Sequence, residues 1–130
     1  MRSLIETVLA PHLGGGHTCT LDGPDVALPA DGMVSLGLVL HELATNAVKY
    51  GAWSQAEGRL AIDWARTEAE GGRLIVSWRE FCPQPIAVPG ERAGFGSRLL
   101  EGAVRQLHGT FTREFHSDGL ELRLDLPLEP

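Results

Sequence analysis

Apolar and polar residues alternate along three stretches of the chain, residues 59–66, 73–80 and 120–126. The apolar members of these series are Leu60, Ile62, Trp64, Leu74, Val76, Trp78, Leu120, Leu122, Leu124 and Leu126. Because the side chains of a strand point alternately to its two faces, a period of two predicts strands that each bury one face. The pattern therefore predicts three strands that share a core.

Turn residues between these stretches predict how the strands are joined. The Glu-Gly-Gly segment at 70–72 separates the first two strands, which predicts a hairpin. Asp118 and Gly119 separate residues 110–116 from the leucine series, so 110–116 is predicted as a partner strand in a second hairpin. His17 to Leu21 is predicted as a further short strand.

A helical period appears between Asp31 and Tyr50. The apolar residues that recur there on one face are Leu36, Val39, Leu40, Leu43 and Ala47. This spacing is typical of a helix packed against a sheet. Asp31 can cap the start of the helix, and Gly51 is placed to stop it.

Two shorter helices complete the pattern. Ser3 to Glu6 has the form of a capping box, which predicts a helix that ends near Pro11 and the glycine run 14–16. A second helix is predicted over 97–107, closed by Gly109. Together these elements predict a two-layer α/β sandwich, with a mixed, mainly antiparallel sheet covered on one face by helices.

Length and composition are consistent with one domain over residues 1–130. The formal net charge of −6 argues against a nucleic-acid-binding protein, which needs a basic surface. No apolar run approaches the roughly 20 residues of a membrane span, so we expect no membrane contact and a cytoplasmic location. Cys19 and Cys82 are too few and too far apart to indicate a disulfide framework or a zinc site.

Three polar residues interrupt the long helix at regular spacing. Glu42, Asn46 and Lys49 stand at i, i+4 and i+7, which places them on one stripe. A carboxamide oxygen is a suitable Mg²⁺ ligand, an ammonium suits phosphate oxygens, and a carboxylate can act as a base or orient one. The stripe thus fits a magnesium-bound polyphosphate, although the pattern alone is also compatible with a solvated helix face.

The sequence around this stripe resembles a known family. Residues 41–52, His-Glu-Leu-Ala-Thr-Asn-Ala-Val-Lys-Tyr-Gly-Ala, resemble the N-box of the HWE and related families of bacterial sensor histidine kinases. Trp78-Arg79-Glu80 matches the Trp-Xaa-Glu element of that family, and residues 94–99 match its second glycine box. These kinases belong to the gyrase, Hsp-type chaperone, histidine kinase and MutL (GHKL) superfamily, so the resemblance implies the Bergerat fold.

The resemblance also implies roles for individual residues. Asn46 matches the asparagine that coordinates Mg²⁺, and Glu42 matches the carboxylate that helps to organise the attacking group. Lys49 and Tyr50 match positions beside the phosphates and the nucleotide. Glu80 falls where the superfamily's carboxylate accepts a hydrogen bond from the exocyclic amine of adenine. ATP and Mg²⁺ are the implied cofactors, with Glu42 and Lys49 as catalytic residues.

The second glycine box is implied to close on the phosphates. Gly94 and Gly96 would let backbone N–H groups approach, and Phe95 lies between them. Ser97 and Arg98 would begin a helix whose positive end favours an anion. Because the protein is acidic overall, positive potential must be local, and Arg92 is a further candidate cation.

His41 is implied to lie at the nucleotide site, since it opens the N-box. The alternative is a buried structural histidine whose ring nitrogen bonds a backbone carbonyl. A zinc hydrolase motif His-Glu-Xaa-Xaa-His is excluded because Thr45 stands where the second histidine would be.

The chain departs from the family pattern in two places. Residues 81–85, Phe-Cys-Pro-Gln-Pro, replace a glycine-containing turn, and prolines in 83–93 stiffen the segment where the nucleotide lid is expected. No His-Arg-Xaa-Lys-Asn element, the family's phosphoacceptor sequence, is found. We therefore expect an isolated catalytic domain that does not phosphorylate itself.

The sequence leads to a principal functional hypothesis and two alternatives. The principal one is an ATP·Mg²⁺-binding domain that phosphorylates a histidine on a separate dimerisation domain, from which a response regulator receives the phosphoryl group. The first alternative is a degenerate domain of the same fold that acts as a docking scaffold for a response regulator or sensor module. A serine kinase of the anti-sigma-factor type shares the fold but fits the motifs less well.

Overall fold

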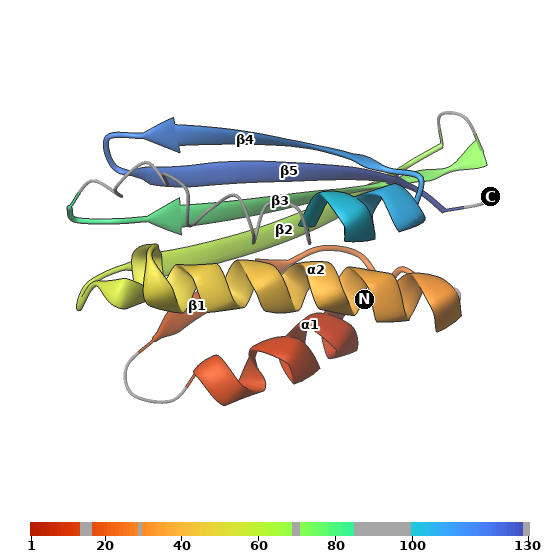
Figure 1. Ribbon diagram of the computed structural model, residues 1–130. Coiled ribbons are helices and arrows are strands. Elements are labelled where there is room, and N and C mark those ends of the chain that lie inside the picture. The colour runs from red at the N-terminus through yellow and green to blue at the C-terminus, as the bar shows by residue number, and fades with distance from the viewer. Residues whose placement is uncertain (14–16, 29, 69–70, 85–99, 129–130) are drawn as a thin grey trace.

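Figure 1 shows the computed structural model, which describes residues 1–13, 17–28, 30–68, 71–84 and 100–128. The helices are α1 (Arg2–Leu9), α2 (Ala30–Lys49) and a helix over residues 100–106, with short 3₁₀ turns η1 (Ala10–His12) and η2 (Ala52–Ser54). The strands are β1 (Thr18–Asp22), β2 (Arg59–Thr67), β3 (Arg73–Phe81), β4 (Thr110–His116) and β5 (Gly119–Pro127).

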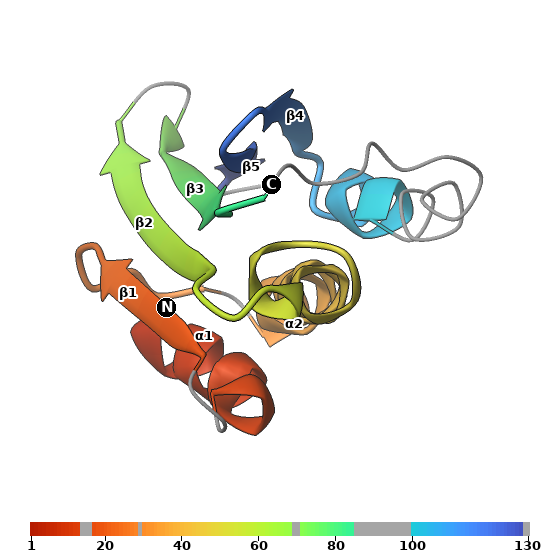
Figure 2. The same ribbon diagram turned by 90° about the vertical axis from the view of Figure 1, so that its left-hand side faces the viewer.

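The strands form one five-stranded sheet in the order β1-β2-β3-β5-β4. β1 runs parallel to β2, and the other neighbouring pairs are antiparallel. The helices lie on one side of this sheet, with α2 between α1 and the 100–106 helix (Figures 1 and 2). The predicted two-layer sandwich with a mixed, mainly antiparallel sheet is confirmed. None of the helices in the described segments is long and apolar enough to cross a membrane.

The core lies between the sheet and α2. Trp78 is fully buried at its centre, opposite Ile62 on β2 and Leu122 on β5. The alternating series of β2, β3 and β5 face inward, as the period of two predicted. The outer face of the sheet is charged and includes the ion pairs Arg79–Asp63 at 2.9 Å and Arg73–Asp125.

Two predicted helix caps are wrong. α1 begins at Arg2 with Met1 as its N-cap, so Ser3 lies within the first turn and caps nothing. The backbone already supplies this start, because the Ile5 N–H donates to the Met1 oxygen and the terminal ammonium donates to the Val26 oxygen. α2 begins at Ala30, so Asp31 lies in its first turn, where a negative charge favours the helix dipole.

The C-terminal ends also differ in detail from the prediction. The helix at 100–106 is followed by His108, which takes the left-handed conformation (φ 56°) that was expected of a glycine. The Gly109 N–H then donates to the Val104 oxygen, as in a Schellman motif. Gly109 is required for a different reason, since a Cβ there would lie 2.7 Å from the Asp125 backbone oxygen as well as 2.3 Å from Leu126 Cδ2. The predicted helix start at 97–99 and the loop at 85–93 lie outside the described residues.

Candidate nucleotide site

The predicted polar stripe lies on the second half of α2. Glu42 and Asn46 are half-buried, whereas Lys49 and Tyr50 are exposed. At about 100° per residue the stripe flanks the apolar face that packs on the sheet. The carboxylate and carboxamide therefore stand at the boundary between core and solvent, with an ammonium one turn further on. Such a boundary position lets a ligand reach them.

His41 does not belong to this stripe. It lies five residues before Asn46, which is about 140° away around the helix. Its ring is exposed and stands 6.3 Å from the ring of His12, at the end of α1. The alternative of a buried structural histidine is therefore wrong, and the structure places His41 on the α1 side of α2. The 100–106 helix lies on the other side of α2 from α1 (Figure 2).

A tryptophan and two further histidines fix the turn that follows α2. The ring of His17 stacks on Trp53 at 5.1 Å and 8°, and the ring of His12 lies 6.2 Å from the same indole. The Trp53 indole N–H donates to the Thr18 oxygen at 3.2 Å. His17 Nδ1 also hydrogen-bonds the His12 oxygen. This cluster ties the α1–β1 connection to η2 and so holds the C-terminal end of α2 in place.

Glu80 connects the Trp-Xaa-Glu element with the end of the N-box. Its side chain is buried, with 3 % exposed. One carboxylate oxygen, Oε2, accepts the Trp78 indole N–H at 2.8 Å, and the other, Oε1, accepts the Ala52 backbone N–H at 2.9 Å. Burial raises the pKa of Glu80, and these two hydrogen bonds oppose the rise. The two sequence motifs are thus in direct contact.

Gly51 is required by this contact. A Cβ at Gly51 would lie 1.9 Å from Glu80 Oε1, so no larger residue fits while the carboxylate stays in place. The backbone of Gly51 also ends α2, because its N–H donates to the backbone carbonyl oxygens of Asn46 and Ala47. Sequence analysis predicted the helix stop but not the carboxylate behind it.

The segment that replaces the family's glycine turn is held by hydrogen bonds. The side-chain amide of Gln55 donates to the backbone oxygen of Gln84 and accepts from the backbone N–H of Gln84, both at 2.9 Å. The Cys82 N–H donates to the Asp118 oxygen at 2.8 Å. No periodic or motif signal marks Gln55, so the sequence does not predict these contacts.

The second glycine box, with Gly94, Phe95, Gly96, Ser97 and Arg98, lies outside the described residues. The helix that follows it packs into the core through Leu100 and Val104, which are each 2 % exposed.

A recess of about 260 Å³ lies at the opposite end of α2. Its lining is Leu28, Asp31, Gly32, Leu36, Gln106, Leu107, His108, Leu126, Pro127 and Leu128. Among the described residues the lining is mainly apolar and includes a carboxylate, but it contains no lysine or arginine. A triphosphate requires cationic partners, so this recess is a poor match for one.

Comparisons with known proteins agree with the motifs. No model of a known protein family matches the chain. The chain is 38 % identical over 128 residues to "Blue-light-activated histidine kinase 1" of Erythrobacter litoralis strain HTCC2594, covering 96 % of this chain and 35 % of the relative. It is 37 % identical over 128 residues to the blue-light-activated histidine kinase of Brucella anthropi, covering 96 % and 26 %. The chain therefore spans about a third or less of these relatives.

Solved structures show the same fold. The catalytic domain of histidine kinase ThkA superposes with a TM-score of 0.77 at 17 % identity, covering 98 % of this chain and 91 % of that one. The histidine kinase domain of the Erythrobacter litoralis EL346 blue-light-activated kinase gives 0.74 at 19 % identity, covering 95 % and 57 %. By sequence this chain is related to the histidine kinases, and its fold is that of histidine kinase catalytic domains.

Proposed function

We propose that the chain is the ATP·Mg²⁺-binding catalytic domain of a sensor histidine kinase of the HWE type. The observation that carries this proposal is the stripe of Glu42, Asn46 and Lys49, which runs along α2 toward the turn held by Glu80. The relationship to histidine kinases over 96 % of the chain supports the same reading.

The donor set on α2 fits a magnesium-bound triphosphate. Asn46 is a half-buried residue, and its carboxamide oxygen is a neutral, hard ligand that leaves room for water and phosphate oxygens around a small ion. Mg²⁺ would neutralise charge on the phosphates. Lys49 would donate to phosphate oxygens, and each charge-assisted bond would contribute about 1.5–3 kcal/mol once the bound nucleotide excludes water. Glu42 would orient the attacking imidazole.

The base would lie near the turn that follows α2. Glu80 already accepts two hydrogen bonds from the protein, but each carboxylate oxygen has a second lone pair. One of these can accept the exocyclic amine of adenine, which guanine does not offer in that position. Glu80 would thus have two roles, since it holds the Gly51–Ala52 turn and reads the base. Tyr50, exposed at the end of α2, would flank the nucleotide.

The phosphoryl group would be donated to a histidine on a separate dimerisation domain. The curated relatives are about three to four times as long as this chain, which supports the presence of further domains in a parent protein. In-line positioning and charge neutralisation would supply most of the catalysis. A response regulator would receive the phosphoryl group in turn.

Titration calorimetry with ATP, in the presence and absence of Mg²⁺, tests the proposal. We expect Asn46→Ala to abolish the Mg²⁺-dependent part of ATP binding and to leave the circular dichroism spectrum unchanged. Val34→Ala is the matched control, because Val34 is 67 % exposed near the other end of the same helix. Unchanged ATP affinity in Asn46→Ala would count against the assignment.

A second function, a docking scaffold that binds nucleotide poorly, is favoured by one observation. The segment after Glu80 has a phenylalanine and a proline in place of the family's glycines and is fixed by Gln55. The same titration separates the two functions. An absent or millimolar response to ATP with Mg²⁺ present would favour the scaffold.

A further inference from the structure

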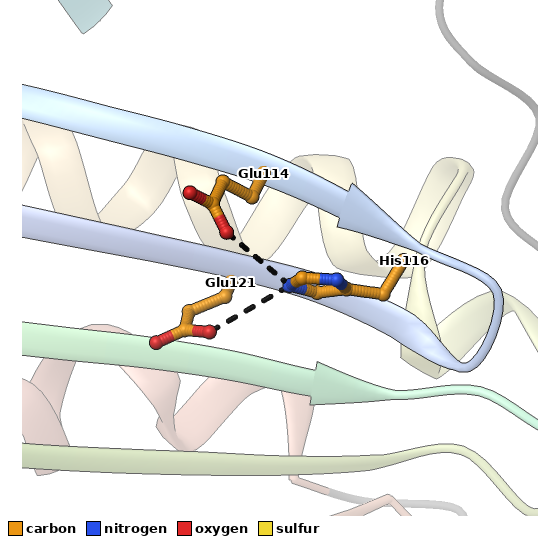
Figure 3. A group of neighbouring side chains, drawn as sticks. All are labelled: Glu114, His116 and Glu121. Carbon is orange, nitrogen blue, oxygen red and sulfur yellow. Dashed lines mark ion pairs between the residues drawn. The ribbon is translucent and has the colours of Figure 1, made fainter.

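Three potential metal ligands meet on the β4–β5 hairpin. Glu114, His116 and Glu121 each offer one ligand atom, and these atoms lie within 4.8 Å of one another (Figure 3). All three side chains are on the outer face of the sheet, away from α2 and from the proposed nucleotide site. Neither the family relationship nor the proposed kinase activity assigns them a role.

The arrangement follows from the geometry of the hairpin. Glu114 and Glu121 stand directly opposite each other on neighbouring strands, so their side chains share one face. His116 lies two residues after Glu114 on the same strand and therefore points to that face as well. A tight turn at residues 117–118 joins the strands, so the three positions are fixed by the sheet.

The distances suit one small divalent ion. His116 Nε2 lies 3.6 Å from Glu114 Oε2 and 3.7 Å from Glu121 Oε2. Two ligands held at about 2.1 Å in tetrahedral geometry around Zn²⁺ would lie about 3.4 Å apart. The two imidazole–carboxylate distances are thus within a few tenths of an ångström of the spacing that an ion requires. The two carboxylate oxygens lie within 4.8 Å of each other, and the exposed side chains can adjust by rotation.

Electrostatics also favour a cation here. Two carboxylates directly opposite each other on a strand pair repel. Arg79, the other cross-strand neighbour of Glu121, donates to Asp63 at 2.9 Å. We propose that Glu114, His116 and Glu121 form a binding site for a divalent transition-metal ion, with Zn²⁺ as the best match. An imidazole nitrogen beside two carboxylates selects such an ion over Mg²⁺, which prefers oxygen ligands alone.

An ion at this site would stiffen the end of the sheet. The hairpin turn packs against the end of β3, where the backbone N–H of Cys82 donates to the backbone oxygen of Asp118. Gly119 approaches β3 so closely that a Cβ at this position would lie 1.8 Å from the backbone carbonyl oxygen of Glu80. Binding of the ion would clamp β4 to β5 and raise the melting temperature of the domain, because only the folded chain brings the ligands together.

Calorimetric titration of the chain with ZnCl₂, without nucleotide or chelator, tests this site. We expect one Zn²⁺ per chain, and at least about tenfold weaker binding in His116→Ala and in Glu114→Gln, since loss of even an outer partner of a ligand costs that much. His108→Ala is the control, because His108 is also exposed but lies outside the cluster. The side chains of His116, Glu114 and Glu121 are 45 %, 72 % and 54 % exposed, respectively. These substitutions should therefore leave the fold intact, as circular dichroism would show.

Amide chemical shifts recorded with Zn²⁺ identify the location independently. We expect the largest changes between Glu114 and Glu121. The proposal is overturned if the wild-type chain binds no Zn²⁺, or if His116→Ala binds it as tightly as the wild type. It is equally overturned if the shifts gather around His12, His17 and His41 instead.

Discussion

Gly51→Ala tests the contact between the N-box and the Trp-Xaa-Glu element. The added Cβ would lie 1.9 Å from Glu80 Oε1, whereas ordinary contacts begin at 3.4 Å. The carboxylate would therefore have to move by the difference, 3.4 − 1.9, or about 1.5 Å. Such a movement breaks the 2.9 Å hydrogen bond that Oε1 accepts from the Ala52 N–H.

The expected cost follows from these two effects. Loss of a hydrogen bond to a charged group costs about 1.5–3 kcal/mol. Overpacking at a site without room costs a further 1–3 kcal/mol or so. Gly51→Ala should therefore lower the free energy of unfolding by about 3 kcal/mol or more, which for a domain of this size lowers the melting temperature by about 10 °C.

Thermal unfolding followed by circular dichroism measures this change. Gly102→Ala is the matched control, because Gly102 is exposed in the 100–106 helix and a Cβ there meets nothing within 4 Å. That substitution should stabilise the domain by roughly 0.5–1 kcal/mol. In a Glu80→Ala background the overlap disappears, so Gly51→Ala should cost less there, with a coupling energy of about 1–3 kcal/mol.

A Gly51→Ala variant that melts at the wild-type temperature would show that the added Cβ does not displace the carboxylate. An equal cost of Gly51→Ala with and without Glu80 would show that the carboxylate is not the obstacle.

Two further predictions concern titratable groups. Because burial raises the pKa of Glu80 above its ordinary value of 4.5, the folded chain binds that proton more tightly than the unfolded chain. The free energy of unfolding of the wild type, relative to that of Glu80→Gln, should therefore fall as the pH rises from 4.5 through the folded-state pKa. Urea unfolding between about pH 4 and 8 measures this difference in free energy. A difference that does not change with pH would contradict the prediction. Burial, with the charges of Glu80 and Asp118, raises the pKa of Cys82 to about 11. Alkylation of the Cys82 thiol should therefore be slow at neutral pH and accelerate about tenfold per pH unit toward 11. Mass spectrometry measures the rate, and rapid modification of Cys82 at neutral pH would refute this prediction.

Most of the sheet could be predicted from the sequence. Strict alternation sets both the strands and their buried faces, so the ends of β2 and β3 fall within one residue of the prediction. The helix ends were less predictable. Ser3 has the residue type of a cap, yet the backbone of Met1 supplies the start, and this depends on a contact with Val26 far along the chain.

The site was predictable only where it is local. The spacing of Glu42, Asn46 and Lys49 fixes their common stripe, because a helix has a constant period. The resemblance implies a place at the nucleotide site for His41, the first residue of the N-box, and the helical period turns this residue toward His12. The bond from Ala52 to Glu80 joins residues 28 apart in the chain, and no local pattern predicts such a tertiary contact.

The most direct measurement of the central proposal is a map of amide chemical shifts as a magnesium complex of a non-hydrolysable ATP analogue is added. We expect saturable changes concentrated between Glu42 and Ala52 and around Glu80, and their loss in Asn46→Ala. An absence of changes at millimolar nucleotide, or changes confined to the recess between Asp31 and Leu128, would contradict it.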